Sequence, residues 1–141
     1  MTALPQGVRA LADAASRAHV ATIMPDGGPH SVPVWVGVEG ERLAFLTHPG
    51  SRKARNLQSD TRIAISLTAE DQPFTMAAIR GRVAERLEGD AAWAVIDRIA
   101  IKYTGRWYPR GEDRVVFIVQ PTAAWGQSFV RTPDASASTP D

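Results

Sequence analysis

The chain has 141 residues and a formal net charge of +1, with 16 lysines and arginines against 15 aspartates and glutamates. Hydrophobic residues make up 44% and charged residues 22%, which is ordinary for a globular domain. The near-neutral charge argues against a dedicated nucleic-acid binder. Because the sequence contains no cysteine, disulfides, thiolate catalysis and cysteine-based zinc sites are excluded.

The first residues show no charged segment followed by a continuous apolar stretch, so no signal peptide is expected. No apolar run approaches the roughly 18 residues that a membrane-spanning helix needs. We therefore expect a cytoplasmic enzyme or binding protein that does not enter a membrane.

Apolar spacing in the first third predicts one helix over about 5–17, followed by three antiparallel strands in a meander. Turn sequences at 25–28 and 39–41 separate these strands. The strands are expected at 19–24, 30–38 and 43–47.

The next part of the chain is predicted to contain a short basic helix after Ser51, a strand at 62–67 and a long strand at 74–87 that bends at Gly81. A helix is expected at 90–102, with Asp90 as its N-cap and Gly105 as its stop. Two further strands are expected at 114–120 and 123–129. The strand at 114–120 is almost wholly apolar, so both of its faces should be covered. Six or seven strands with few helices predict a mainly β protein, an antiparallel barrel in a single domain over 1–130. The small and polar residues 131–141 are expected to form a disordered tail.

The basic segment at 47–57 reads Thr-His-Pro-Gly-Ser-Arg-Lys-Ala-Arg-Asn-Leu, and it joins a strand to a helix start. Free backbone N–H groups and the positive end of a helix dipole attract anions at such a position. Arg52 and Lys53 supply charge, and Ser51 supplies a hydroxyl donor. The segment therefore suits a phosphate, although its spacing is not that of a P-loop and a merely solvated helix start is the alternative.

The segment at 30–35 carries Pro33 inside a strand pattern and ends at Trp35. Proline removes a ladder N–H, so Pro33 belongs at a sheet edge or a bulge. Backbone groups left free there can bond a planar heterocycle. Trp35 either stacks on such a ring or belongs to the core.

Three aromatic residues, Tyr103, Trp107 and Tyr108, form a second cluster in the loop expected beyond the helix. They either line a substrate pocket or plug the core. Tyr108 and His48 are candidate proton donors. The histidines lack the spacing of metal ligands, so no metal site is expected.

The motif Ser51-x-Lys53-Ala54-x-Asn56-Leu57, followed by an Asp-Thr-Arg-Ile sequence at 60–63 and a strand, resembles the pyridoxamine 5′-phosphate oxidase-like superfamily. The resemblance extends over about 20–125. It implies a split β-barrel of the FMN-binding type.

The resemblance also implies a bound FMN or deazaflavin coenzyme F-420, held in a groove between the two subunits of a homodimer. The residues that would bind this cofactor are Val32, Pro33, Val34, Trp35, Thr47, Ser51, Arg52, Lys53 and Asn56. The substrate pocket would contain Tyr103, Trp107 and Tyr108. No metal is implied.

The function expected on this basis is a flavin- or deazaflavin-dependent oxidoreductase that transfers hydride between the cofactor and a planar conjugated organic substrate. Two alternatives stay open. One is a protein that binds or stores the flavin or deazaflavin without catalysis. The other, disfavoured by the net charge of +1, is a nucleic-acid or general anion binder.

Overall fold

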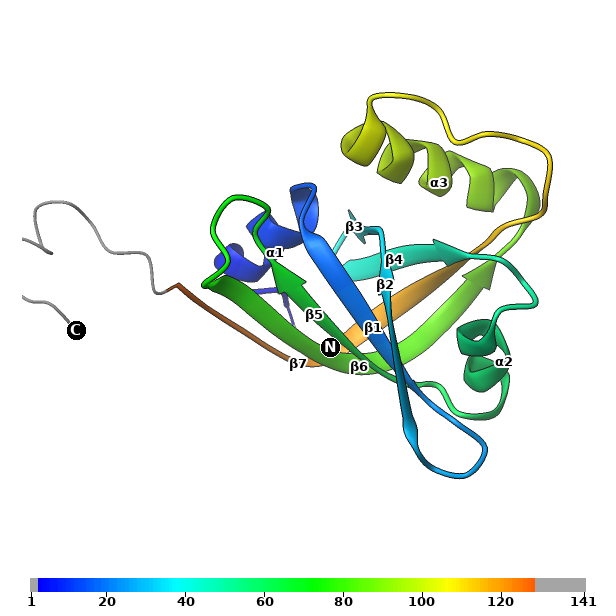
Figure 1. Cartoon of the computed structure of the whole chain (residues 1–141), viewed down its shortest axis with the longest axis horizontal. Coiled ribbons are helices and arrows are strands. Elements are labelled where there is room, and N and C mark those ends of the chain that lie inside the picture. Colours follow the sequence, from blue (N-terminus) through cyan, green and yellow to red (C-terminus); the bar gives the residue numbers. More distant parts are fainter. Residues whose placement is uncertain (1–2, 129–141) are drawn as a thin grey trace, which may run out of the picture.

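The computed structural model describes residues 3–128, so the predicted tail at 131–141 lies outside the described residues. Within these residues, three helices and seven strands follow one another (Figure 1). They are α1 (Gln6–Asp13), β1 (Arg17–Ile23), β2 (Pro29–Val34), β3 (Val36–Glu39), β4 (Arg42–Thr47), α2 (Arg52–Ser59), β5 (Arg62–Thr68), β6 (Thr75–Leu87), α3 (Gly89–Thr104) and β7 (Val115–Ser128).

All seven strands form one antiparallel sheet in the order β2-β1-β5-β6-β7-β4-β3, which curls into a split β-barrel (Figure 1). The two edge strands, β2 and β3, are consecutive in the sequence, and only Trp35 lies between them. The chain therefore crosses at Trp35 from one edge of the sheet to the other. This crossing is where the barrel is split.

The barrel interior is filled by inward side chains that alternate along the strands, as the period of two requires. Val20 of β1, Ile65 of β5 and Phe45 of β4 are fully or almost fully buried there. Helix α1 covers the interior with Val8 and Leu11. Helix α1 thus closes the core on a side that the strands leave open.

A second apolar layer lies outside the barrel, where α3 covers strands β3, β4 and β7 (Figure 1). Val116 and Ile118 of β7 face α3, while Val115, Phe117 and Val119 face the barrel interior. The prediction that both faces of this strand are covered is confirmed.

Several predicted boundaries were wrong for identifiable reasons. Helix α1 ends at Asp13 instead of 17, because the buried Ser16 hydroxyl donates to the Leu11 carbonyl (2.7 Å) and the chain turns into β1. The expected strand at 30–38 is divided at Trp35. Glu88 occupies the N-cap position of α3, and Asp90 lies in the first turn, where its charge still favours the helix dipole.

The two strands expected at the end of the chain are one continuous strand, β7. Pro121 does not interrupt it, because a bulge lies there and the pairing shifts between Arg80 and Gly81. The predicted bend at Gly81 is thereby confirmed. So are the helix stop at Gly105, which has φ +78°, and the position of Pro33 on an edge strand.

No helix within residues 3–128 is long and apolar enough to cross a membrane.

Candidate cofactor site

The crossing at Trp35 is held in place by two side chains from the end of α3. The Tyr103 hydroxyl accepts a hydrogen bond from the Val36 N–H (3.4 Å) and donates to the Ser16 carbonyl (2.7 Å). The Lys102 ammonium group donates to the Val36 and Ala12 carbonyls. Burial lowers the pKa of Lys102 to about 8. At Val36 these bonds satisfy backbone groups that the edge strand β3 would otherwise leave unpaired.

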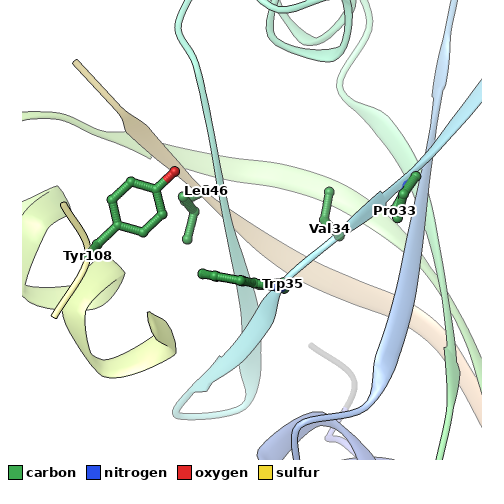
Figure 2. A pocket seen from close by; sticks show the side chains of 5 residues that line it. All are labelled: Pro33, Val34, Trp35, Leu46 and Tyr108. Carbon is green, nitrogen blue, oxygen red and sulfur yellow. The ribbon is translucent and has the colours of Figure 1, made fainter. Parts of the chain in front are cut away.

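A shallow cleft of about 280 Å³ opens beside the crossing (Figure 2). Its lining comes from three parts of the chain and consists of Pro33, Val34, Trp35, Leu46 and Tyr108. The walls are mostly apolar, and the polar side-chain groups among the lining residues are the Tyr108 hydroxyl and the Trp35 indole N–H. Such a surface suits a flat, mostly apolar ring that carries few hydrogen-bonding groups.

The indole of Trp35 is packed between two tyrosines. Tyr103 stacks on it with ring centroids 5.3 Å apart and an interplanar angle of 7°. Tyr108 meets it edge-on, with centroids 6.2 Å apart and an angle of 81°. Tyr103 therefore covers one face of the indole, so a ligand ring has only the remaining surface available for contact.

The backbone of Tyr108 is fixed by the buried carboxylate of Asp97 on α3. Asp97 accepts from the Tyr108 N–H (3.2 Å) and from both terminal nitrogens of Arg110 (3.0 and 2.8 Å). The hydrogen bonds from Arg110 hold the pKa of Asp97 below its ordinary value, and the Tyr108 N–H acts in the same direction. The loop that carries Tyr108 is thus anchored to α3.

The Tyr108 hydroxyl accepts from Arg114 Nε (3.2 Å). Within residues 3–128 it donates to no other protein group, so its own proton can be donated into the cleft.

We expect Asp97→Asn to loosen this loop, because the neutral amide keeps an acceptor for Tyr108 but loses the charge that Arg110 binds. The free energy of unfolding at pH 7 should fall by about 1 kcal/mol, since Arg110 is half exposed and solvent screens the pair. The folded-state pKa is lowered, so this stabilisation is fully present above about pH 4 and is lost as the pH falls through the folded value.

Urea unfolding between pH 7 and pH 3 checks this prediction. The wild type and Asp97→Asn should differ at pH 7 and converge in acid, while Asp71→Asn, at an exposed loop position that forms no ion pair within residues 3–128, should show no such convergence. A difference that stays constant down to pH 3 would contradict the assignment.

The basic segment between β4 and α2 is ordered by its own side chains. Thr47, at the end of β4, donates to Ser51 Oγ (2.9 Å), and Ser51 Oγ caps α2 by accepting from the Ala54 N–H (3.2 Å). His48 Nδ1 accepts from the Gly50 N–H (3.0 Å). Because Ser51 Oγ accepts twice, its own proton is left for a further acceptor.

The two cations at the start of α2 lack carboxylate partners within residues 3–128. Lys53 is half buried and burial lowers its pKa. Arg52 extends into a depression beside the turn between β1 and β2, which Arg55 and Asn56 also line, and its buried Nε has no hydrogen-bond partner. An anion at this helix start would supply the missing acceptor.

The structure therefore brings only part of the predicted set to the cleft, namely Pro33, Val34, Trp35 and Tyr108. Val32 packs against the barrel core. Asn56 is buried and donates to Thr22 Oγ1 (3.0 Å).

The remaining members of the predicted aromatic cluster do not line the cleft. Tyr103 belongs to the last turn of α3, not to the loop beyond it, and acts as the support for Trp35. Trp107 is 70% exposed.

Sequence reasoning missed Leu46 and the anchors of Tyr108, which are Asp97, Arg110 and Arg114. Leu46 was placed in a strand, and only the pairing of strands shows that it faces the cleft. For Asp97 a signal exists: a carboxylate one residue after Ile96, inside the apolar stripe of a helix, needs a cationic partner when it is buried.

Comparison with known proteins decides the family. A family model described as pyridoxamine 5′-phosphate oxidase matches residues 4–128. The chain belongs to this family. The family resemblance inferred from the basic motif is thus confirmed, and the match extends over nearly all of the described residues.

Several solved structures share the fold. An F-420 reductase superposes with a TM-score of 0.73 at 29% identity, covering 86% of this chain and 98% of that protein. A conserved hypothetical protein from Mycobacterium tuberculosis gives a TM-score of 0.69 at 22% identity, covering 90% of each chain. HupZ from Group A Streptococcus gives 0.68 at 16% identity, covering 89% and 95%. A search of curated proteins finds no match.

Members of the family are often dimeric and bind small-molecule cofactors, flavins among them. No group of three or more metal-ligating side chains occurs in the part of the chain that the structure describes.

Proposed function

We propose that this protein is an oxidoreductase that binds FMN or the deazaflavin coenzyme F-420 and acts on a planar conjugated organic substrate. The observation that carries the proposal is the pairing of an apolar, aromatic cleft with an unpartnered cationic helix start, joined by strand β4. Leu46 lines the cleft, and the next residue, Thr47, bonds to the N-cap of α2. Membership of the family and the similarity to an F-420 reductase support the same class.

The cofactor phosphate would be held by Ser51, Arg52 and Lys53, with Thr47 and Asn56 behind them. The residues fit an anion on two counts: the proton of Ser51 Oγ is free to donate, and neither cation is neutralised by a carboxylate within residues 3–128. The ring would lie against Val32, Pro33, Val34 and Trp35, where an edge strand leaves backbone groups unpaired.

When bound, such a cofactor supplies the hydride transfer. The protein's own part is to fix the ring against the cleft and to exclude water with apolar walls. Tyr108 would hold a proton at its hydroxyl for the substrate, since Arg114 bonds only the hydroxyl oxygen. His48 is the weaker candidate, because its Nδ1 already accepts from Gly50.

We further propose a homodimer with the cofactor at the interface. The cleft of about 280 Å³ lies just below the range of about 300–1,000 Å³ that pockets for small molecules occupy. One copy therefore does not enclose a tricyclic ring. A second copy placed over the cleft would complete its walls, and sedimentation with and without cofactor tests this.

The deciding experiment is the absorbance spectrum of the ligand released from purified protein, followed by reconstitution with FMN and with coenzyme F-420. We expect one of the two to bind and then to be reduced or reoxidised by quinone or enone substrates. Binding without turnover of any substrate would favour a storage role. A colourless protein that neither cofactor reconstitutes would contradict the proposal.

A further inference from the structure

The last turn of α3 reaches the crossing at Trp35 from outside the cleft. Neither Lys102 nor Tyr103 lines the cleft of about 280 Å³. Both nevertheless bond Val36, the residue that directly follows Trp35: the Val36 N–H donates to the Tyr103 hydroxyl, and the Val36 carbonyl accepts from the Lys102 ammonium group. Both backbone polar groups of Val36 are thus held by side chains of one helical turn.

The same two side chains are anchored at the end of α1. The Lys102 ammonium group also donates to the Ala12 carbonyl (2.8 Å). The Tyr103 hydroxyl donates to the Ser16 carbonyl (2.7 Å). The buried Ser16 hydroxyl in turn donates to the Leu11 carbonyl (2.7 Å), which fixes the turn that offers these acceptors. A shift of the crossing would therefore break bonds that also tie α3 to α1.

The Tyr103 ring also fixes the orientation of the indole. It is stacked on Trp35, with ring centroids 5.3 Å apart and an interplanar angle of 7°. Lys102 Nζ lies 5.1 Å from the centroid of the Tyr103 ring, which is within cation–π distance. On the cleft side, Trp35 extends from the crossing toward Tyr108 (Figure 2). The wall of the cleft is therefore supported by residues behind it.

Lysine is an unfavourable residue for mere packing at this position. Burial lowers the pKa of Lys102 from its ordinary 10.5 to about 8, because the ammonium group loses water on entering the protein. An apolar side chain of similar length would fill the same space without this desolvation penalty. The ammonium group is therefore explained by the two carbonyls that it bonds.

We infer that Lys102 is a positioning residue, which holds Trp35 in the orientation that the cofactor ring contacts. It acts through the backbone of Val36 and the ring of Tyr103, and the inference rests on the proposed function. Trp35 belongs to no strand, and β3 is an edge strand with β4 as its neighbour, so the sheet alone fixes this wall weakly. A wall that is already oriented binds a ring more tightly, since less ordering accompanies binding.

Lys102→Met tests the inference, because methionine keeps an apolar stem and removes the charge with its hydrogen bonds. The four tryptophans give four indole N–H signals in NMR spectra, and Trp35→Phe assigns the signal of Trp35. In the cofactor-free Lys102→Met protein this signal should shift or broaden, while that of Trp125 on β7 should not move. Fluorescence titration should show that FMN or coenzyme F-420, whichever the wild type binds, is bound about three- to tenfold more weakly.

Tyr103→Phe is the milder second variant, and it serves if Lys102→Met does not fold. Phenylalanine keeps the ring that stacks on Trp35 and removes the hydroxyl that bonds Val36. The same indole signal should shift, and the cofactor should again bind about three- to tenfold more weakly. The double variant should lose less than the product of the two single losses, because both side chains hold the same residue.

Two controls separate positioning from other effects. Arg98→Met removes a cation from the same helix, together with its bonds to Glu39 of β3 (2.7 and 2.8 Å), but leaves Val36 untouched. Its cofactor affinity should stay within about twofold of the wild type. Ile65→Val removes a buried methyl group from the barrel interior, so it should lower the melting temperature without shifting the Trp35 signal.

Two results would overturn the inference. One is an unchanged Trp35 signal and an unchanged affinity in both Lys102→Met and Tyr103→Phe. The other is an equal loss of affinity in Arg98→Met, which would assign the effect to contact between α3 and β3 in general. A wild type that binds neither cofactor would refute the proposed function, while the indole signal would still decide whether Lys102 positions Trp35.

Discussion

Replacing Lys53 with alanine should weaken binding of the cofactor by about tenfold to 150-fold. A charge-assisted hydrogen bond to an anion contributes about 1.5–3 kcal/mol, and each 1.4 kcal/mol corresponds to a factor of ten in Kd. The stability of the cofactor-free folded protein should not fall. Burial already lowers the pKa of Lys53, and no carboxylate within residues 3–128 is left unpaired when the lysine is removed.

Fluorescence titration with FMN or coenzyme F-420 measures this effect, and thermal unfolding of the cofactor-free protein provides the stability readout. Arg98→Ala is the matched control, because it removes one positive charge from an exposed position on α3 that lines neither the cleft nor the depression at the start of α2. Equal losses in the two variants would indicate general attraction of an anion to the protein surface. An unchanged affinity in Lys53→Ala would remove this residue from the phosphate site.

Gly81→Ala should be the most damaging single substitution in the sheet. The added Cβ would lie 2.3 Å from the Gln120 carbonyl oxygen and 3.1 Å from Pro121 Cα, and both neighbours are backbone atoms that cannot rotate away. Forcing extra volume into a packed site costs about 1–3 kcal/mol, and here strands β6 and β7 must separate. That loss is a large part of the roughly 5–15 kcal/mol that stabilises a small domain.

Denaturant unfolding checks this prediction against Gly7→Ala, which makes the same chemical change in α1. A Cβ at Gly7 meets nothing within 4 Å. Alanine also favours a helix over glycine by up to about 1 kcal/mol, so this control should be neutral or stabilising. If Gly81→Ala unfolded at the same denaturant concentration as the wild type, the close approach of the two strands would be disproved.

Much of the fold was predictable because its signals are local. Alternating apolar residues marked the strand that became β5, and turn sequences separated β1 from β2 and β3 from β4. The basic segment at 47–57 was recognisable as a helix start after a strand, and Ser51 does cap α2. These features depend on residues within four positions of one another.

Two of the predicted boundaries failed where distant segments intervene. The strand expected over 30–38 is divided because Trp35 stacks on Tyr103, whose hydroxyl binds the backbone of Val36. Pro121 looked like a break between two strands, yet a bulge opposite Gly81 lets β7 continue. Neither partner lies near in the sequence.

The candidate site divides in the same way. The sequence by itself determined the family, the cationic helix start at Ser51–Lys53 and the position of Pro33 at either an edge or a bulge, because each rests on a short motif. Only the tertiary structure decided that Tyr108 faces the cleft while Tyr103 supports Trp35. Those placements follow from strand pairing and from packing of α3, and both join residues that are far apart along the chain.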